Sequence, residues 1–219
     1  MNFKNAFLFT GLLVVSLQVT QGEAISNNLE APTDYTEEAS GDSWLTASFG
    51  TGAASYKLTD VTLLMLSDFN IGTAQVGLYS DVEGEPGTLL STLRSPASYS
   101  TTLANTIFTD SGYGLSANST YWIVLQSVSG SFQWAFTDDN TGSGVGFRAA
   151  WGSSENVGAT WFTSALQPMQ MRVDASAVPE PSSIVLLGLG LLAFFARGLL
   201  ASKSNLLRAD RAGNSSALR

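Results

Sequence analysis

The sequence feature that most constrains the fold is a period of two in the hydrophobic pattern of several short segments. In residues 131–138, Phe132, Trp134 and Phe136 fall on one side of an extended chain, and small or polar residues fall on the other. The same alternation recurs in two further segments, residues 73–79 and 169–174. This pattern is typical of β-strands with one buried face and one face in water.

Two other segments, residues 61–67 and 120–126, are apolar on both faces and are predicted to be central strands. Breakers rich in Gly, Pro, Asn and Asp, such as residues 85–87 and 139–142, separate about ten strand-like segments. No amphipathic helix pattern interrupts them. The sequence therefore predicts an all-β domain over residues 43–174, an antiparallel two-sheet sandwich of jelly-roll-like form.

The N-terminus has the layout of a secretory signal peptide. A basic residue near the start is followed by an apolar run over residues 6–19 and by small residues at Gly22 and Ala24. We therefore predict a signal helix over residues 1–24, cleaved after one of these two small residues, with Ala24 preferred. Residues 25–42 are polar, acidic and rich in turn formers, and are predicted to form a flexible acidic leader.

A second apolar segment lies near the C-terminus. A helix over residues 184–201 spans about 27 Å, close to the roughly 30 Å of a hydrocarbon core, with Arg197 near its end. We expect a single transmembrane helix there, followed by a basic cytoplasmic tail over residues 202–219. Basic residues stay on the cytoplasmic side, so the main domain is predicted to face outward. The basic residues that set this orientation are Arg197, Lys203, Arg208 and Arg211.

The segment before this helix carries a short motif, Pro179, Glu180 and Pro181, in a linker predicted over residues 175–183. Prolines keep such a segment extended and accessible outside a bilayer. Together with the apolar helix and Arg197, the motif resembles the PEP-CTERM sorting signal of Gram-negative bacteria. The resemblance implies an exosortase-like membrane protease as a partner and a host that makes exopolysaccharide. A plain single-span membrane anchor remains the alternative.

The middle of the chain also resembles a known domain, the choice-of-anchor R domain, over about 130 residues. That family is defined by its occurrence on envelope proteins with varied C-terminal anchors, so the resemblance implies surface display and no catalytic residues. The matching positions are Trp44, Phe49, Thr51, Gly52, Val61, Leu78, Tyr79, Pro86, Gly87, Leu115, Thr120, Tyr121 and Trp122.

The chain contains no His and no Cys, which excludes Ser-His-Asp and Cys-His nucleophiles, ordinary zinc sites and disulfides. We predict no cofactor. A carboxylate-dependent glycoside hydrolase remains an alternative, and needs two of the loop carboxyls Asp81, Glu83, Glu85, Asp138 and Asp139 to converge. The weak candidates for a calcium site of a kind other than an EF-hand are Asp81, Glu83, Asp138 and Asn140.

Five tryptophans invite a second interpretation, a carbohydrate-binding module. Trp122 and Trp134 lie in strand patterns that predict burial, as is usual for large aromatic side chains. Trp151 and Trp161 flank a Gly- and Ser-rich segment and are the candidates for an exposed, sugar-binding pair.

The exported part is strongly acidic, because residues 25–177 hold fifteen acidic residues and four basic ones, a net charge of −11. This charge repels nucleic acid. We therefore expect an exported, non-enzymatic protein with a structural or adhesive role. It is predicted to stay anchored at the cell envelope, or to reach the outer surface or extracellular matrix after C-terminal processing. Its expected partners are the membrane, the processing protease and extracellular polysaccharide.

Overall fold

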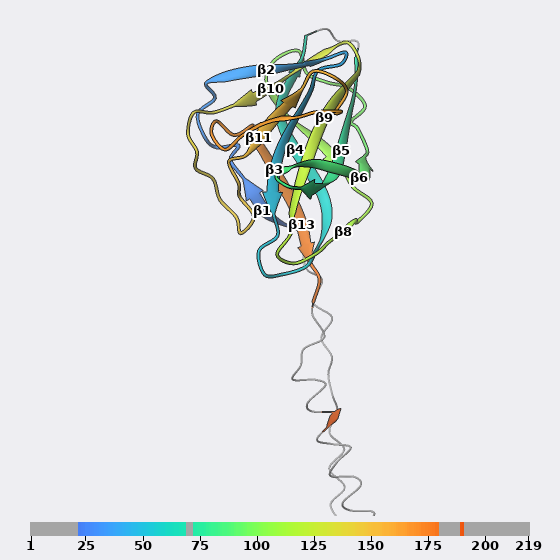
Figure 1. The fold of residues 1–219 in the computed structure, drawn as a ribbon, viewed down its shortest axis with the longest axis vertical. Helices are drawn as coiled ribbons and strands as arrows, with labels where there is room; N and C mark the ends of the chain where they lie inside the picture. The colour runs from blue at the N-terminus through green and yellow to red at the C-terminus, as the bar shows by residue number, and fades with distance from the viewer. Residues whose placement is uncertain (1–21, 69–71, 180–188, 191–219) are drawn as a thin grey trace, which may run out of the picture. The chain divides into compact units, whose positions relative to one another are not determined.

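The computed structural model describes residues 22–68, 72–179 and 189–190, and the first two ranges form two antiparallel sheets (Figure 1). The strands are β1 (Glu23–Asn27), β2 (Tyr35–Ser40), β3 (Trp44–Gly50), β4 (Tyr56–Ser67), β5 (Thr73–Val82), β6 (Glu85–Leu93), β7 (Ala104–Thr109), β8 (Gly114–Leu115), β9 (Thr120–Ser129), β10 (Ser131–Phe136), β11 (Trp151–Ser154), β12 (Phe162–Ser164) and β13 (Met171–Ala177). Within these two ranges no residue is helical, so the predicted all-β class and the two antiparallel sheets are confirmed.

The two sheets have different central strands. The seven-stranded sheet runs β1-β13-β4-β10-β2, with β7 and β8 also paired to β4. The six-stranded sheet runs β12-β11-β3-β9-β5-β6. The segments predicted to be central from their two-sided apolar pattern are β4 and β9, and both have partners on each side. This prediction is confirmed.

The core lies between the sheets and is formed by the inward positions of the alternating segments. Phe132 and Trp134 on β10 are fully buried, as are Ile123 on β9 and Phe49 on β3. The indole N–H of Trp134 donates to the backbone oxygen of Gln170 at 2.9 Å, so its burial leaves no polar group unpaired. Each such side chain contributes about 1.5–3 kcal/mol by leaving water.

The segment predicted as a flexible leader, residues 25–42, is instead part of the fold. It contributes most of β1, which pairs with β13, and all of β2, which pairs with β10 along its full length. The side chain of Asn28 pins the connection between these strands, because it donates to Met169 and accepts from the N–H of Met171. The partners of this acidic segment lie more than 90 residues away in the chain, and local composition does not reveal them.

The turn between β5 and β6 also differs from the prediction. Residues 85–87 were expected to break the chain, but they lie in β6, an edge strand that can accommodate Pro86 without losing a ladder hydrogen bond. The reversal is made by Glu83 and Gly84, whose φ angles are 56° and 87°. Positive φ at both central positions is what a tight two-residue hairpin requires.

The last strand of the sandwich extends into the residues that were predicted to form the linker. Residues 175–177 belong to β13, so the linker predicted over 175–183 begins too early. The N–H of Val178 still donates to the backbone oxygen of Ser55 at 2.9 Å. Contacts divide the chain into two units after this residue, residues 1–178 and 179–219.

The predicted terminal segments fall largely outside the described residues. This applies to residues 1–21 of the signal helix and to the tail over 202–219. Of the predicted transmembrane helix over 184–201, Leu189 and Gly190 are described and are helical. Among the described residues, no helix has the length and apolar character needed to cross a membrane.

Candidate functional site

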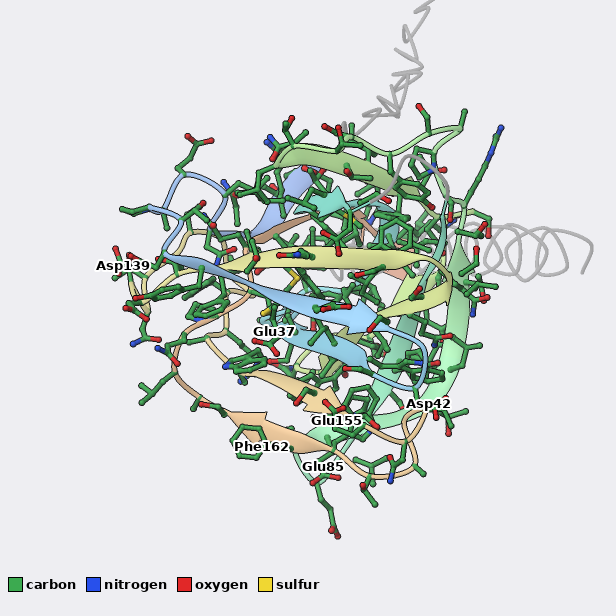
Figure 2. The ribbon with its side chains drawn as sticks, turned by 90° about the horizontal axis from the view of Figure 1, so that it is seen from above. Glu37, Asp42, Glu85, Asp139, Glu155 and Phe162 are labelled. Atoms are coloured by element: carbon green, nitrogen blue, oxygen red, sulfur yellow. The ribbon has the colours of Figure 1, made fainter. Side chains whose placement is uncertain are left out.

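The loop carboxylates considered for hydrolysis divide between two places, the β5–β6 hairpin and the loop after β10. Asp81 accepts a hydrogen bond from the indole N–H of Trp122 at 2.7 Å. Glu83 and Glu85 are exposed at the tip of the β5–β6 hairpin. Figure 2 shows Glu85 well apart from Asp139, which lies in the loop after β10.

The weak calcium candidates are likewise separated and have other contacts. The Asp138 carboxylate accepts from the side chain of Gln167, and the Asn140 side chain accepts from the Gln167 backbone N–H. These two residues therefore hold the loop after β12, whereas Asp81 contacts Trp122. Over residues 22–68 and 72–179, no group of three or more Asp or Glu residues is arranged to hold a metal ion.

The two tryptophans proposed as a sugar-binding pair have different neighbours. Both are partly exposed. The indole of Trp151 donates to the backbone oxygen of Leu166 at 2.8 Å and packs against the core. Trp161 lies beside Gly158, which also contacts the indole of Trp44. A side chain at Gly158 would meet these rings, so this glycine permits the packing of Trp44 and Trp161.

Trp151 belongs to a different aromatic group, which we call the aromatic row. It consists of Tyr35, Phe136, Trp151 and Phe162, with successive ring centroids 5.6, 6.3 and 6.5 Å apart. The row joins β2 and β10 of one sheet to β11 and β12 of the other. Tyr35 and Phe162 at its ends are 63% and 64% exposed, and Figure 2 shows Phe162 at the periphery. Exposed rings of this kind can contact the apolar face of a sugar.

The outward face of the six-stranded sheet presents a second candidate site. Tyr121, Ile123 and Leu125 of β9 enter the core, so Trp122 must face away from it. Trp122 is nevertheless only 2% exposed, which confirms its predicted burial on a face that the sequence did not identify. On the same outward face, the side chain of Gln126 donates to the hydroxyl of Tyr79 at 2.7 Å. Burial raises the pKa of Tyr79, and this hydrogen bond partly lowers it again.

Residues 146–150 run beside β3, and Phe147 and Arg148 line the same cavity as Trp122 on this outward face. Gly146 accepts from the N–H of Gly50 and donates to the oxygen of Ile25, both at 2.7 Å, so the segment joins β3 to β1. A Cβ on Gly146 would lie 1.9 Å from the oxygen of Gly50, so only glycine fits there. Farther along, Ala150 accepts from the N–H of Ser48 at 2.9 Å. The glycines at 144 and 146 are the sequence signal for this close approach.

Two adjoining cavities lie where this segment meets the sheet, and we call them together the outer groove. The larger has a volume of about 520 Å³ and is lined by Ser48, Asp81, Thr120 and Trp122, among others. The smaller has a volume of about 360 Å³ and includes Asn118 and Ser119. The two cavities share Phe147 and Arg148 in their walls. Asp81 and Trp122 could be identified from the sequence, whereas Ser48 and Arg148 could not.

Two carboxylates elsewhere have clearly raised pKa values. Burial raises the pKa of Glu37, and the negative charges of Glu155 and Glu38 raise it further. Burial also raises the pKa of Asp60, as does the carboxylate of Asp174 directly opposite on β13. For Asp60, a hydrogen bond from Thr59 and the charge of Arg172 act in the opposite direction.

Comparison with known families identifies the C-terminal element. Residues 177–198 match the PEP-CTERM protein-sorting motif, and the match includes Pro179, Glu180, Pro181 and Arg197. This part of the predicted resemblance is confirmed. The motif marks an exported protein that carries a C-terminal, membrane-anchored sorting signal, and motifs of this kind are exosortase substrates in general. No curated protein matches the chain significantly.

Proposed function

We propose that this protein is displayed at the cell envelope or in the extracellular matrix as a non-enzymatic, adhesive β-sandwich. The observation that carries the proposal is the sorting motif at residues 177–198, which starts at the last residue of β13. The resemblance of the sandwich to the choice-of-anchor R domain is part of the same proposal.

The place of the motif suits a removable anchor. β13 lies between β1 and β4 and pairs with β4 as far as Ala177. The contact division after Val178 leaves all the strands of the described residues on the N-terminal side. Cleavage beyond Pro179 therefore removes none of the core, and the sandwich can remain folded after processing.

The proposed orientation follows from charge. Arg197 and the basic residues of the tail stay cytoplasmic, which places the sandwich outside. An exosortase-like membrane protease then meets the extended segment around Pro179 and Pro181 just outside the bilayer. In the alternative, a plain anchor, the same helix is retained.

The intact mass of the mature protein from its native host tests the proposal. We expect loss of the N-terminal signal peptide and of the segment beyond the motif. Replacing Pro179 and Pro181 together with Ala is expected to leave the C-terminal mass in place, while the control Pro96→Ala, in a loop of the sandwich, is processed normally. Recovery of the uncleaved chain from the cytosol would reject the proposal, and a mature chain that keeps its C-terminus would favour the plain anchor.

A second candidate function is carbohydrate binding by the sandwich, and the aromatic row favours it. Its two exposed ends, Tyr35 and Phe162, offer ring surface to a polysaccharide. Replacing both with Ala is expected to weaken retention on immobilised polysaccharide from the host, with the exposed Val128→Ala on β9 as the control. Equal retention of the two variants would remove the row as a binding surface.

The remaining alternative, a carboxylate-dependent glycoside hydrolase, has less support. Such enzymes hold two carboxyl groups roughly 5–9.5 Å apart across a bound sugar. Asp81 and Asp138 instead have separate partners, Trp122 and Gln167. Release of reducing sugar from host polysaccharide by the purified protein would overturn the non-enzymatic proposal.

A further inference from the structure

We propose that the outer groove binds a saccharide unit that bears a carboxylate, with Arg148 as the cation that recognises it. This inference goes beyond sorting and names a site separate from the aromatic row. It depends on the proposed export only for the place where the protein meets this ligand. Binding itself is tested on purified protein and does not depend on export.

Arg148 is placed to meet an anion. It is exposed and lines both cavities of the groove. Its guanidinium lies against Gly50, where a Cβ would come within 3.0 Å of its Nε. Among the described residues it makes no hydrogen bond or ion pair, whereas Arg172 is paired with Asp174 at 2.7 Å. A guanidinium can bind a carboxylate through two parallel hydrogen bonds.

Ser48 supplies an independent observation. It is 1% exposed, lines the larger cavity, and its hydroxyl has no hydrogen-bond partner. Buried hydroxyl groups in proteins nearly always have a partner, so one without a partner in a residue that lines a cavity favours a ligand group that binds there. A ligand hydroxyl can supply the missing bond.

The other walls suit the remainder of a sugar. Asp81 is held by the indole N–H of Trp122, and its carboxylate can accept from ligand hydroxyls. Thr120 adds a hydroxyl to the larger cavity, and Asn118 adds an amide to the smaller one. A few fixed polar groups between aromatic side chains are typical of ligand sites in proteins.

The net charge of the sandwich limits which anionic ligands the outer groove can bind. Residues 25–177 carry a net charge of −11, which repels densely charged polymers such as nucleic acids. Arg148 alone can offset the single charge of a uronate-type sugar, while Asp81 accepts from the hydroxyl groups of the ligand. A polymer in which such units recur can then meet the groove one unit at a time.

Isothermal titration of the full-length protein in mild detergent tests the inference. The probe is tetragalacturonate, and its fully methyl-esterified form is the neutral control. We expect measurable binding of the acid and at least tenfold weaker binding of the ester. Arg148→Gln is expected to weaken binding of the acid at least tenfold, whereas Arg94→Gln, which removes an exposed arginine away from the groove, has little effect. Ser48→Ala is expected to weaken binding several-fold while the melting temperature does not fall.

Several outcomes would overturn the inference. Equal binding of acid and ester would show that the carboxylate is not recognised, and equal effects of the two arginine variants would show only general electrostatics. Loss of binding in Tyr35→Ala or Phe162→Ala, with Arg148→Gln unaffected, would assign the sugar to the aromatic row. No binding of the acid would also reject the groove. None of these results bears on the sorting of the chain, which the mature mass tests separately.

Discussion

The two faces of β9 differ in what covers them. On the inner face, Ile123 and Leu125 pack between the sheets with no exposed surface. On the outer face, Trp122 is equally buried, but it is bonded to Asp81 and lines a cavity that also contains an unpaired hydroxyl. One strand thus separates a region that stabilises the fold from a region with the polar groups that binding requires.

The largest effect is expected from the inner face. Ile123→Ala should lower the free energy of unfolding by about 2–5 kcal/mol, because it leaves a cavity in a fully packed core. Denaturant unfolding followed by tryptophan fluorescence measures the change. The control Val128→Ala removes a 63% exposed side chain from the same strand and should change stability by no more than about 0.5 kcal/mol. Equal losses in both variants would contradict the assignment of the core.

A smaller effect is expected from the outer face. Trp122→Phe should cost about 1–2 kcal/mol, since it removes the N–H that donates to Asp81 and part of the buried ring. The same unfolding measurement applies. Asp81→Asn keeps an acceptor oxygen and should cost much less. A larger loss of unfolding free energy in Trp122→Phe than in Ile123→Ala would show that the outer face of β9 contributes more to stability than the inner face.

The unpaired hydroxyl of Ser48 in the outer groove is expected to lower the free energy of unfolding. Ser48→Ala should raise the free energy of unfolding by about 1 kcal/mol, because a buried hydroxyl without a partner is costly. Thr46→Val, on the same outward side of β3, is the matched control and should be destabilising, since its hydroxyl donates to the backbone oxygen of Ile123. A loss of stability in Ser48→Ala would show that the hydroxyl is bonded in the free protein.

The smallest effect concerns charge on the other sheet. The pKa of Asp60 is raised above its ordinary value of 3.8, so the folded state binds this proton more tightly than the unfolded state. Stability from this group is therefore present at low pH and is lost as pH rises through the raised pKa. Asp60→Asn should remove that loss and stabilise the protein at pH 7 by roughly 0.2–0.5 kcal/mol.

Unfolding curves at pH 4 and pH 7 measure this effect, and the benefit of Asp60→Asn should be larger at pH 7. The control is Asp42→Asn, an exposed carboxylate in the turn before β3, for which we expect no stabilisation. A benefit confined to pH 4 would show that the sign is wrong.

Those parts of the fold that depend on neighbouring residues could be predicted from the sequence. The alternation around Trp134 correctly predicted that Phe132 and Trp134 are buried, because successive side chains in a strand point to opposite faces. The opposite face was predicted to lie in water, but Ala135 on that face is buried as well. The prediction of a flexible leader was wrong for β1 and β2, because it relied on the acidic composition of this segment. Those strands are stabilised by β13 and β10, and no local pattern reports such distant partners.

The outer groove, too, could be predicted from the sequence only in part. Trp122 was predicted to be buried, and it is, but periodicity could not tell which of two covered faces it occupies. Arg148 could not be identified as a binding residue from the sequence, because it is a single basic residue in a loop. Its position depends on Gly144 and Gly146, which lack side chains and so let the segment lie against Ile25 and Gly50.

The sequence by itself determined that the chain is built of strands, that the large aromatic residues Phe132 and Trp134 are buried, and that a sorting motif follows the sandwich. These properties depend on the order of neighbouring residues, which hydrophobic periodicity and a short linear motif record directly. Only the tertiary structure decided that residues 146–150 lie beside β3 and place Arg148, Ser48 and Asp81 around one groove. That arrangement comes from backbone hydrogen bonds between segments roughly 100 residues apart, whose closure depends on the whole fold.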